Sequence, residues 1–109
     1  MGKILEEVKH KIGPSADYEY FDINILDAIN EAFALLQQLG AGPEEGFTVT
    51  PDTEWEEFTT DKVLLGFVKK YVEKKTVMTF DTPNNGNLIE ALKNQIFDLE
   101  WRINIHVDP

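Results

Sequence analysis

A helical repeat of large apolar residues near the C-terminus is the strongest constraint that this sequence places on its fold. Five of these residues are separated by three, four, three and four positions, namely Ile89, Leu92, Ile96, Leu99 and Ile103. This spacing puts all five side chains on one side of an α-helix and does not fit the alternation of a strand. We therefore predict a helix from Asn87, as its N-cap, to about Asn104, packed along this side.

The same predicted helix carries a second apolar side. Phe97, Trp101 and Ile105 are four positions apart and point away from the first five residues. A helix that is apolar on two sides is expected to be buried on both. One side would face the core of the chain. The other would face a partner molecule, or else be covered by the N-terminal helix or by the segment around Phe47.

Three further helices are indicated by apolar residues that recur every three or four positions. The first runs from Lys3 to about Ile12. The second runs from Asp22, a candidate N-cap, to Leu39, where Gly40 is expected to end it. The third runs from Thr60 or Asp61 to about Phe80.

Between the second and third predicted helices lies a segment rich in glycine, proline and threonine. The alternation in residues 47–50 favours a short strand or an extended arm. Thr53 and Glu56 have the spacing of a capping box, which predicts one helical turn over Trp55–Phe58. The predicted fold is all-α: a single domain over residues 1–109, with a small bundle of about four helices and an extended loop or short β arm around residues 40–52.

Charge is distributed unevenly along the chain. The net charge is -10, and residues 12–61 contain twelve acids and no Lys or Arg. An acidic surface that keeps the protein soluble explains this pattern. A subunit with one acidic and one basic side, which could associate head to tail into a ring, explains it as well. The candidate acidic face, lining a channel or meeting a partner, comprises Glu44, Glu45, Asp52, Glu54, Glu56 and Glu57.

The candidate interface combines the second apolar side of the last helix with lysines of the third. Its members are Lys69, Lys70, Lys74, Lys75, Phe97, Trp101 and Ile105. Lys75 falls on the apolar side of its helix. Its stem is expected either to lie along the apolar surface with the charge in water, or to pair with a carboxylate in the chain or across a subunit contact.

No pattern in the sequence indicates catalysis, and we expect no catalytic residue, no metal site and no cofactor. The chain has no cysteine, which suits a reducing cytoplasm, and no GxSxG, Walker A or GxGxxG pattern. His10 and His106 have no helical histidine partner and are expected to be solvated. No apolar run is long enough to span a membrane.

Parts of the last two predicted helices resemble a known family. The residues that carry the resemblance are Lys69-Lys70-Tyr71-Val72, Phe80-Asp81-Thr82-Pro83, Ile89-Glu90-Ala91-Leu92-Lys93 and Leu99-Glu100-Trp101-Arg102-Ile103-Asn104. They resemble the head–tail connector, or DNA-packaging, proteins of long-tailed bacteriophages and prophages. The likeness extends through Phe21-Asp22, Leu39-Gly40 and Gly46-Phe47, and so covers most of the chain.

The resemblance implies a structural virion protein at the head–tail interface, made in the cytoplasm of a host bacterium. It implies a homo-oligomeric ring of about twelve subunits, formed freely or only on the portal. The implied partners are further copies of the chain, the portal protein, and a stopper or tail-completion protein. Double-stranded DNA would pass through the ring without tight binding, since acids disfavour contact with phosphates.

A second interpretation comes from the acidity alone. The chain could be an acidic helical adaptor, or an inhibitor that mimics the charge of DNA and binds a basic protein. The two interpretations differ in oligomeric state and partner, because a connector subunit should bind portal assemblies and an inhibitor should bind a basic enzyme.

Overall fold

The structure is a computed structural model that describes residues 2–12, 21–80 and 84–108. Its elements are α1 (Ile4–Ile12), α2 (Asp22–Gln38), the short 3-10 helix η3 (Trp55–Glu57), α3 (Lys62–Phe80) and α4 (Gly86–Val107). Within the described ranges there is no strand, only an isolated bridge between Lys3 and Glu54. The predicted all-α bundle of four helices is confirmed, and the segment over residues 40–52 is a loop.

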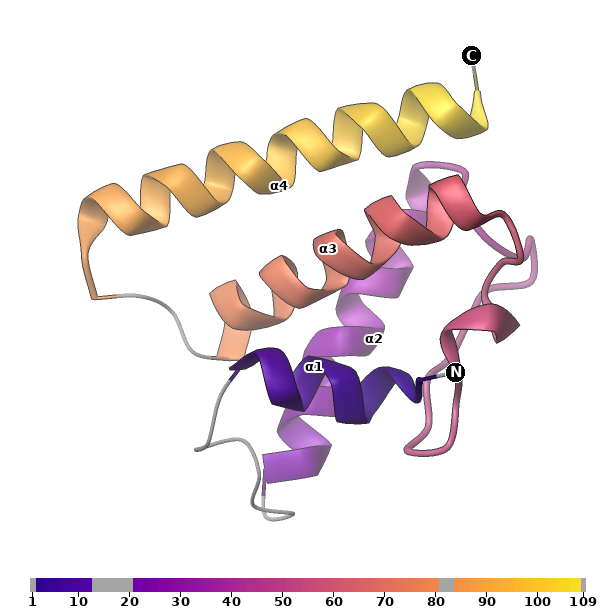
Figure 1. Ribbon diagram of the computed structural model, residues 1–109, viewed down its shortest axis with the longest axis horizontal. Coiled ribbons are helices and arrows are strands. Elements are labelled where there is room, and N and C mark those ends of the chain that lie inside the picture. The colour runs from indigo at the N-terminus through magenta and orange to yellow at the C-terminus, as the bar shows by residue number, and fades with distance from the viewer. Residues whose placement is uncertain (1, 13–20, 81–83, 109) are drawn as a thin grey trace.

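The helices form three layers, with α3 in the middle. Helix α4 lies on one side of α3, and α1 and α2 lie on the other (Figure 1). Val68, Tyr71 and Val72 of α3 are completely buried, as are Ile25 and Ile29 of α2. Among the described residues, no helix is long and apolar enough to cross a membrane.

Two helix ends form as predicted. After α2, Gly40 has φ +90°, and its N–H and that of Ala41 donate to the carbonyls of Gln37 and Leu36. This is the glycine-ended hydrogen-bond pattern that closes many helices. Before α3, Asp61 Oδ1 accepts from the N–H groups of Val63 and Leu64 at 3.0 and 3.1 Å. A carboxylate in this position also interacts favourably with the positive end of the helix dipole.

Two predicted caps are wrong. Asp22 is the first residue of α2 and not its N-cap, a position that Phe21 takes without a side-chain hydrogen bond. Asp22 pairs instead with Lys9 of α1, at 2.7 Å. The cap of α4 is Asn85 and not Asn87, because Asn85 Oδ1 accepts from the N–H groups of Asn87 and Leu88 at 2.8 and 3.4 Å. Helix α4 also extends three residues beyond the predicted end.

The loop over residues 47–50 is held by a side chain and not by a neighbouring strand. Asn30 of α2 accepts a hydrogen bond from the N–H of Val49 at 2.7 Å and donates one to its carbonyl at 3.2 Å. The amide therefore satisfies the same two backbone groups that a strand partner would satisfy. Val49 is buried, and of the two predicted alternatives the loop is formed and the short strand is not.

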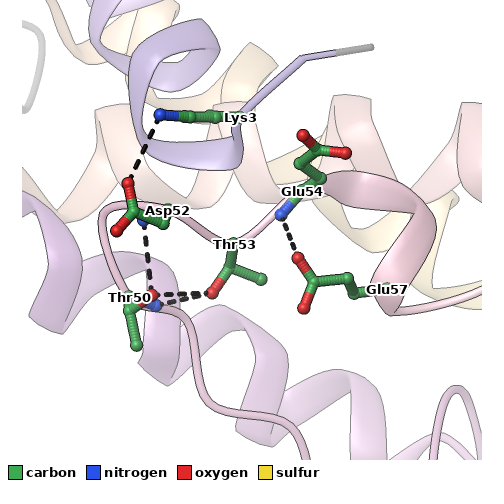
Figure 2. Close-up of polar contacts among 6 residues, drawn as sticks. All are labelled: Lys3, Thr50, Asp52, Thr53, Glu54 and Glu57. Carbon is green, nitrogen blue, oxygen red and sulfur yellow. Dashed lines mark hydrogen bonds and ion pairs between the residues drawn. The ribbon is translucent and has the colours of Figure 1, made fainter.

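The predicted turn at Trp55 is present, with a different cap. Glu57 accepts from the N–H of Glu54 at 2.8 Å, so the pair is shifted by one residue from the predicted Thr53 and Glu56 (Figure 2). Thr53 Oγ1 accepts instead from the N–H of Thr50 at 2.8 Å and closes the preceding turn. This order of turns directs the Trp55 ring into the core, where it is fully buried.

Aromatic side chains from the loop and α2 form one cluster. Phe33 lies 5.0 Å from Phe47, 4.9 Å from Phe58 and 6.3 Å from Trp55, measured between ring centroids. The cluster requires a glycine at position 42, where φ is +86° and a Cβ would lie 2.3 Å from a ring carbon of Phe58. Close packing of these rings therefore anchors the loop to α2.

We predict that Gly42→Ala lowers the free energy of unfolding by about 2–4 kcal/mol, because the new methyl group is strained by its backbone and overlaps the Phe58 ring. Gly66→Ala is the matched control. It lies in α3 with nothing within 4 Å of the added carbon, and should raise stability by about 0.5–1 kcal/mol. Urea denaturation followed by circular dichroism measures both; equal effects would contradict the packing described here.

Candidate interaction surface

Helix α4 presents a row of large apolar side chains to solvent. Phe97, Trp101 and Ile105 are 74%, 61% and 43% exposed. The opposite side of the helix packs on α3 through Ile96, Leu99 and Ile103, which are buried. The prediction that α4 has two apolar sides, one of them in the core, is therefore confirmed.

Neither α1 nor the segment around Phe47 covers this row. Helix α1 packs against α2 and α3, while Phe47 contacts Phe33 and Phe58. That expectation for the second side of α4 is wrong, because α3 separates α4 from these elements (Figure 1). An exposed aromatic patch of this kind is typical of a surface that binds another protein.

The row is bordered by two shallow grooves that share Trp101. One groove, of about 590 Å³, is lined by Leu39, Phe97, Trp101 and Asn104, with Asp98 among its polar residues. The other, of about 310 Å³, lies between α4 and the start of α3. Trp101 is therefore a ridge with a depression on each side, a shape that offers an anchor to a partner.

Polar contacts fix the orientation of α4 on α3. Tyr71 donates its hydroxyl hydrogen to Glu100 Oε2 at 2.8 Å, and Lys74 Nζ donates to Gln95 Oε1 at 2.8 Å. Burial, together with the Glu100 carboxylate, raises the pKa of the Tyr71 hydroxyl well above its usual range. The hydroxyl thus stays protonated as a donor, and these bonds set which side of α4 faces outward.

The C-terminal end of α4 is tied to the start of α3. His106 Nε2 lies 2.8 Å from Asp61 Oδ2, so the expectation that both histidines are solvated is wrong for His106. His10, by contrast, is exposed. The hydrogen bond with His106 lowers the pKa of the Asp61 carboxyl below its usual range, and the N–H group of Leu64 lowers it further.

The four candidate lysines do not share one face. Lys69 Nζ lies 5.7 Å from the centroid of the Trp55 ring, in cation–π geometry. Lys70 is exposed, and Lys74 is hydrogen-bonded to Gln95. Lys75 is half-buried, and no carboxylate of the described residues is seen to pair with it. This agrees with a stem that lies along the helix surface.

Lys70 and Lys74 of α3 and Lys11 of α1 lie near the carboxylate of Glu73. Together with Glu73 and Asp98 they line a groove of about 460 Å³ between α1, α3 and α4. Burial raises the pKa of the Glu73 carboxyl, and Lys11 counteracts part of that rise. Lysines thus predominate in this groove of an acidic chain.

Several candidate acids serve the local structure of the loop. Asp52 pairs with Lys3 at 3.3 Å (Figure 2). The Ile4 N–H donates to the Thr53 carbonyl at 2.9 Å. Glu57 accepts the Glu54 N–H, and Glu56 is only partly exposed. Glu44 and Glu45 are exposed. The acids therefore do not form one uniform face.

Two contributors to the surface are absent from the sequence-based predictions. Val63 is 58% exposed, and Phe67 is half-buried beside Trp101 and Ile105 in the groove between α3 and α4. The sequence does contain a pattern that indicates this side of α3. Its members are spaced by four, three and four positions, which places them on one side of a helix: Val63, Phe67, Lys70 and Lys74. No group of three or more metal-ligating side chains is found among the residues that the structure describes.

The described residues form a small helical bundle with an exposed aromatic and charged surface that is suited to contacts with other proteins. A family model described as phage connector protein matches residues 4–109. The chain therefore belongs to the phage connector protein family and is a structural virion protein of the head–tail connection. Comparison with curated proteins and with solved structures finds no significant match.

We predict a defined acid sensitivity for the tie between α3 and α4. Folding lowers the pKa of the Asp61 carboxyl, so the ionised carboxylate stabilises the folded protein. This stabilisation is complete above the pKa that Asp61 has in the unfolded chain, and it is lost as the pH falls through the pKa that Asp61 has in the folded protein. Asp61→Asn retains an oxygen for the helix cap and loses the charge. The stability difference between wild type and Asp61→Asn should therefore shrink below about pH 4. Denaturation at a series of pH values measures it; a difference independent of pH would contradict this role.

Proposed function

We propose that the protein is a subunit of the head–tail connector ring. In this role it docks on the portal, extends the channel through which DNA passes, and provides the surface to which the tail or a stopper protein attaches. Its partners are further copies of itself, the portal, and a stopper or tail-completion protein. The chain is made in the cytoplasm of the bacterial host and becomes part of the virion.

The observation that carries this proposal is the exposed row Phe97, Trp101 and Ile105 on a chain of the connector family. Large apolar side chains in water are unfavourable by about 25 cal/mol for each Å² that a partner could bury. A subunit that functions within an assembly can carry such a row on its surface, because neighbouring proteins cover the row once the assembly has formed.

Charge supports a channel through which DNA moves without sticking. The chain carries a net charge of -10, and Glu44 and Glu45 lie exposed on the loop after α2. Acids that face a duplex repel its phosphates and disfavour tight binding. We propose that part of the candidate acidic face lines the channel.

The alternative, an adaptor or inhibitor that mimics DNA charge, has less support. A DNA mimic needs an array of free, solvent-facing carboxylates. Two candidate acids have partners within the chain, Asp52 with Lys3 and Glu57 with the Glu54 backbone, and Glu56 is only partly exposed. The exposed aromatic row has no role in charge mimicry. Strong binding to a basic enzyme, without binding to a portal, would favour the alternative.

We predict that portal binding depends on the aromatic row. Trp101→Ser and Phe97→Ser should weaken binding to purified portal assemblies by about tenfold or more each, since aromatic anchors carry much of the energy of an interface. Leu88→Ser is the matched control, because Leu88 is 59% exposed on α4 and lies outside the row. Pull-down and electron microscopy of the mixture measure binding; unchanged binding by both row variants would contradict the proposal.

Reversal of the candidate lysines tests the ring contact. Replacing Lys69, Lys70 and Lys74 by Glu is expected to block ring assembly if these lysines meet acids of a neighbouring copy. Lys69→Glu would also remove the contact with the buried Trp55 ring. The variant K70E/K74E keeps that contact and loses only the exposed hydrogen bond from Lys74 to Gln95, so it gives a cleaner result. Rings that assemble unchanged on the portal would show that these lysines make no subunit contact.

A further inference from the structure

The exposed sides of α3 and α4 combine into one polarised surface, which we name the α3–α4 face. Its apolar end consists of Val63, Phe67, Trp101 and Ile105, which line a common groove with Arg102 and His106. Trp101 separates this groove from the one lined by Phe97, so its two sides can contact a neighbouring copy and the portal at the same time. Its basic end consists of Lys70 and Lys74, near Lys11. The acids on this surface are Glu73 and Asp98, and Asp98 is paired with Arg102 at 2.8 Å. At the basic end three lysines face two acids, one of which is paired with Arg102, so positive charge is in excess beside the aromatic groups.

The chain carries a second surface with the opposite charge, which we name the α2 groove. It is a depression of about 480 Å³ with Phe21, Ala28 and Phe80 as its apolar residues and Asp27 and Glu31 as its charged ones. Both acids are exposed, and no Lys or Arg lines the groove in the part of the chain that the structure describes. Beside it, Ile23 at the start of α2 is 74% exposed.

The apolar end of the α3–α4 face and the α2 groove lie at opposite ends of α3, and the basic end of the face lies between them along the helix. The apolar end of the α3–α4 face begins at Val63, in the first turn of α3, whereas the α2 groove contains Thr79 and Phe80 of its last turn. Helix α4 and the N-terminal half of α2 also project on opposite sides of α3 (Figure 1). A single chain therefore cannot bring its own two surfaces together, but two copies can.

We infer that the α3–α4 face of one copy docks against the α2 groove of the next copy, with Lys70 and Lys74 directed at Asp27 and Glu31. This inference rests on the proposed ring and names the surfaces that build it. A contact between two different patches of identical chains is heterologous, and it repeats around a ring until the ring closes. Apolar groups at both surfaces supply affinity, while the charges fix register and exclude contact between like surfaces.

Charge reversal gives a sharp test, because the two reversed variants are complementary to each other. K70E/K74E makes the face acidic, and D27K/E31K makes the groove basic. Each variant alone should self-associate about tenfold or more weakly than wild type, because like charges then meet. An equimolar mixture should recover association, since each reversed surface finds a reversed partner. Sedimentation velocity up to millimolar concentration, with circular dichroism as a folding check, measures this.

Two control variants match the changes in net charge. K62E/K93E reverses two exposed lysines outside the face, and E90K/D108K reverses two exposed acids near the two ends of α4, outside both surfaces. Both controls should associate as wild type does. A wild-type chain that stays monomeric, controls that associate as weakly as the test variants, or a mixture that fails to recover would each overturn the inference.

Binding of the wild type to purified portal, measured separately, distinguishes this inference from the proposed function. Portal binding by a chain that shows no self-association would overturn the docking of copies described here and would leave the connector role in place. Self-association without any portal binding would support the contact between copies and count against the connector role.

Discussion

Burial of α3 on two sides is the constraint on which the rest of the structure depends. Val68, Tyr71 and Val72 are completely buried in this helix, which contacts α1, α2, η3 and α4. Because α3 lies between α4 and the other helices, α4 packs mainly on α3. Its second apolar side is left in solvent as a direct consequence, and the interaction surface arises from how the layers are ordered.

The charge pattern is less simple in the fold than along the chain. The acidic stretch contains Asp52, Glu57 and Asp61, which pair with a lysine, a backbone N–H group and a histidine within the same molecule. Lys69 likewise lies over an aromatic ring. A nearby opposite charge, as Lys3 is for Asp52, reduces the field of a carboxylate outside the molecule, whereas the backbone N–H group orients the Glu57 carboxylate and leaves its charge in place.

The errors in the predicted caps have one physical origin. Asn85 and Asn87 are both suited to cap a helix, as are Thr53 and Glu54 with their partners three residues on. Local sequence cannot rank such neighbours, because the choice depends on how the preceding chain approaches the core. The choice between the two alternatives for residues 47–50, a loop or a short strand, has a related origin: Asn30, distant in sequence, supplies the two hydrogen bonds that a second strand would otherwise supply.

The sequence by itself determined the four helices and the buried side of α4, because a helix forms between near neighbours and its apolar period is visible in Ile96, Leu99 and Ile103. Only the tertiary structure decided that Phe97 and Trp101 remain outside, and that Val63 and Phe67 of α3 join Trp101 in one surface. Exposure depends on which elements pack together across long stretches of chain, and the spacing of residues within one helix carries no information about that arrangement.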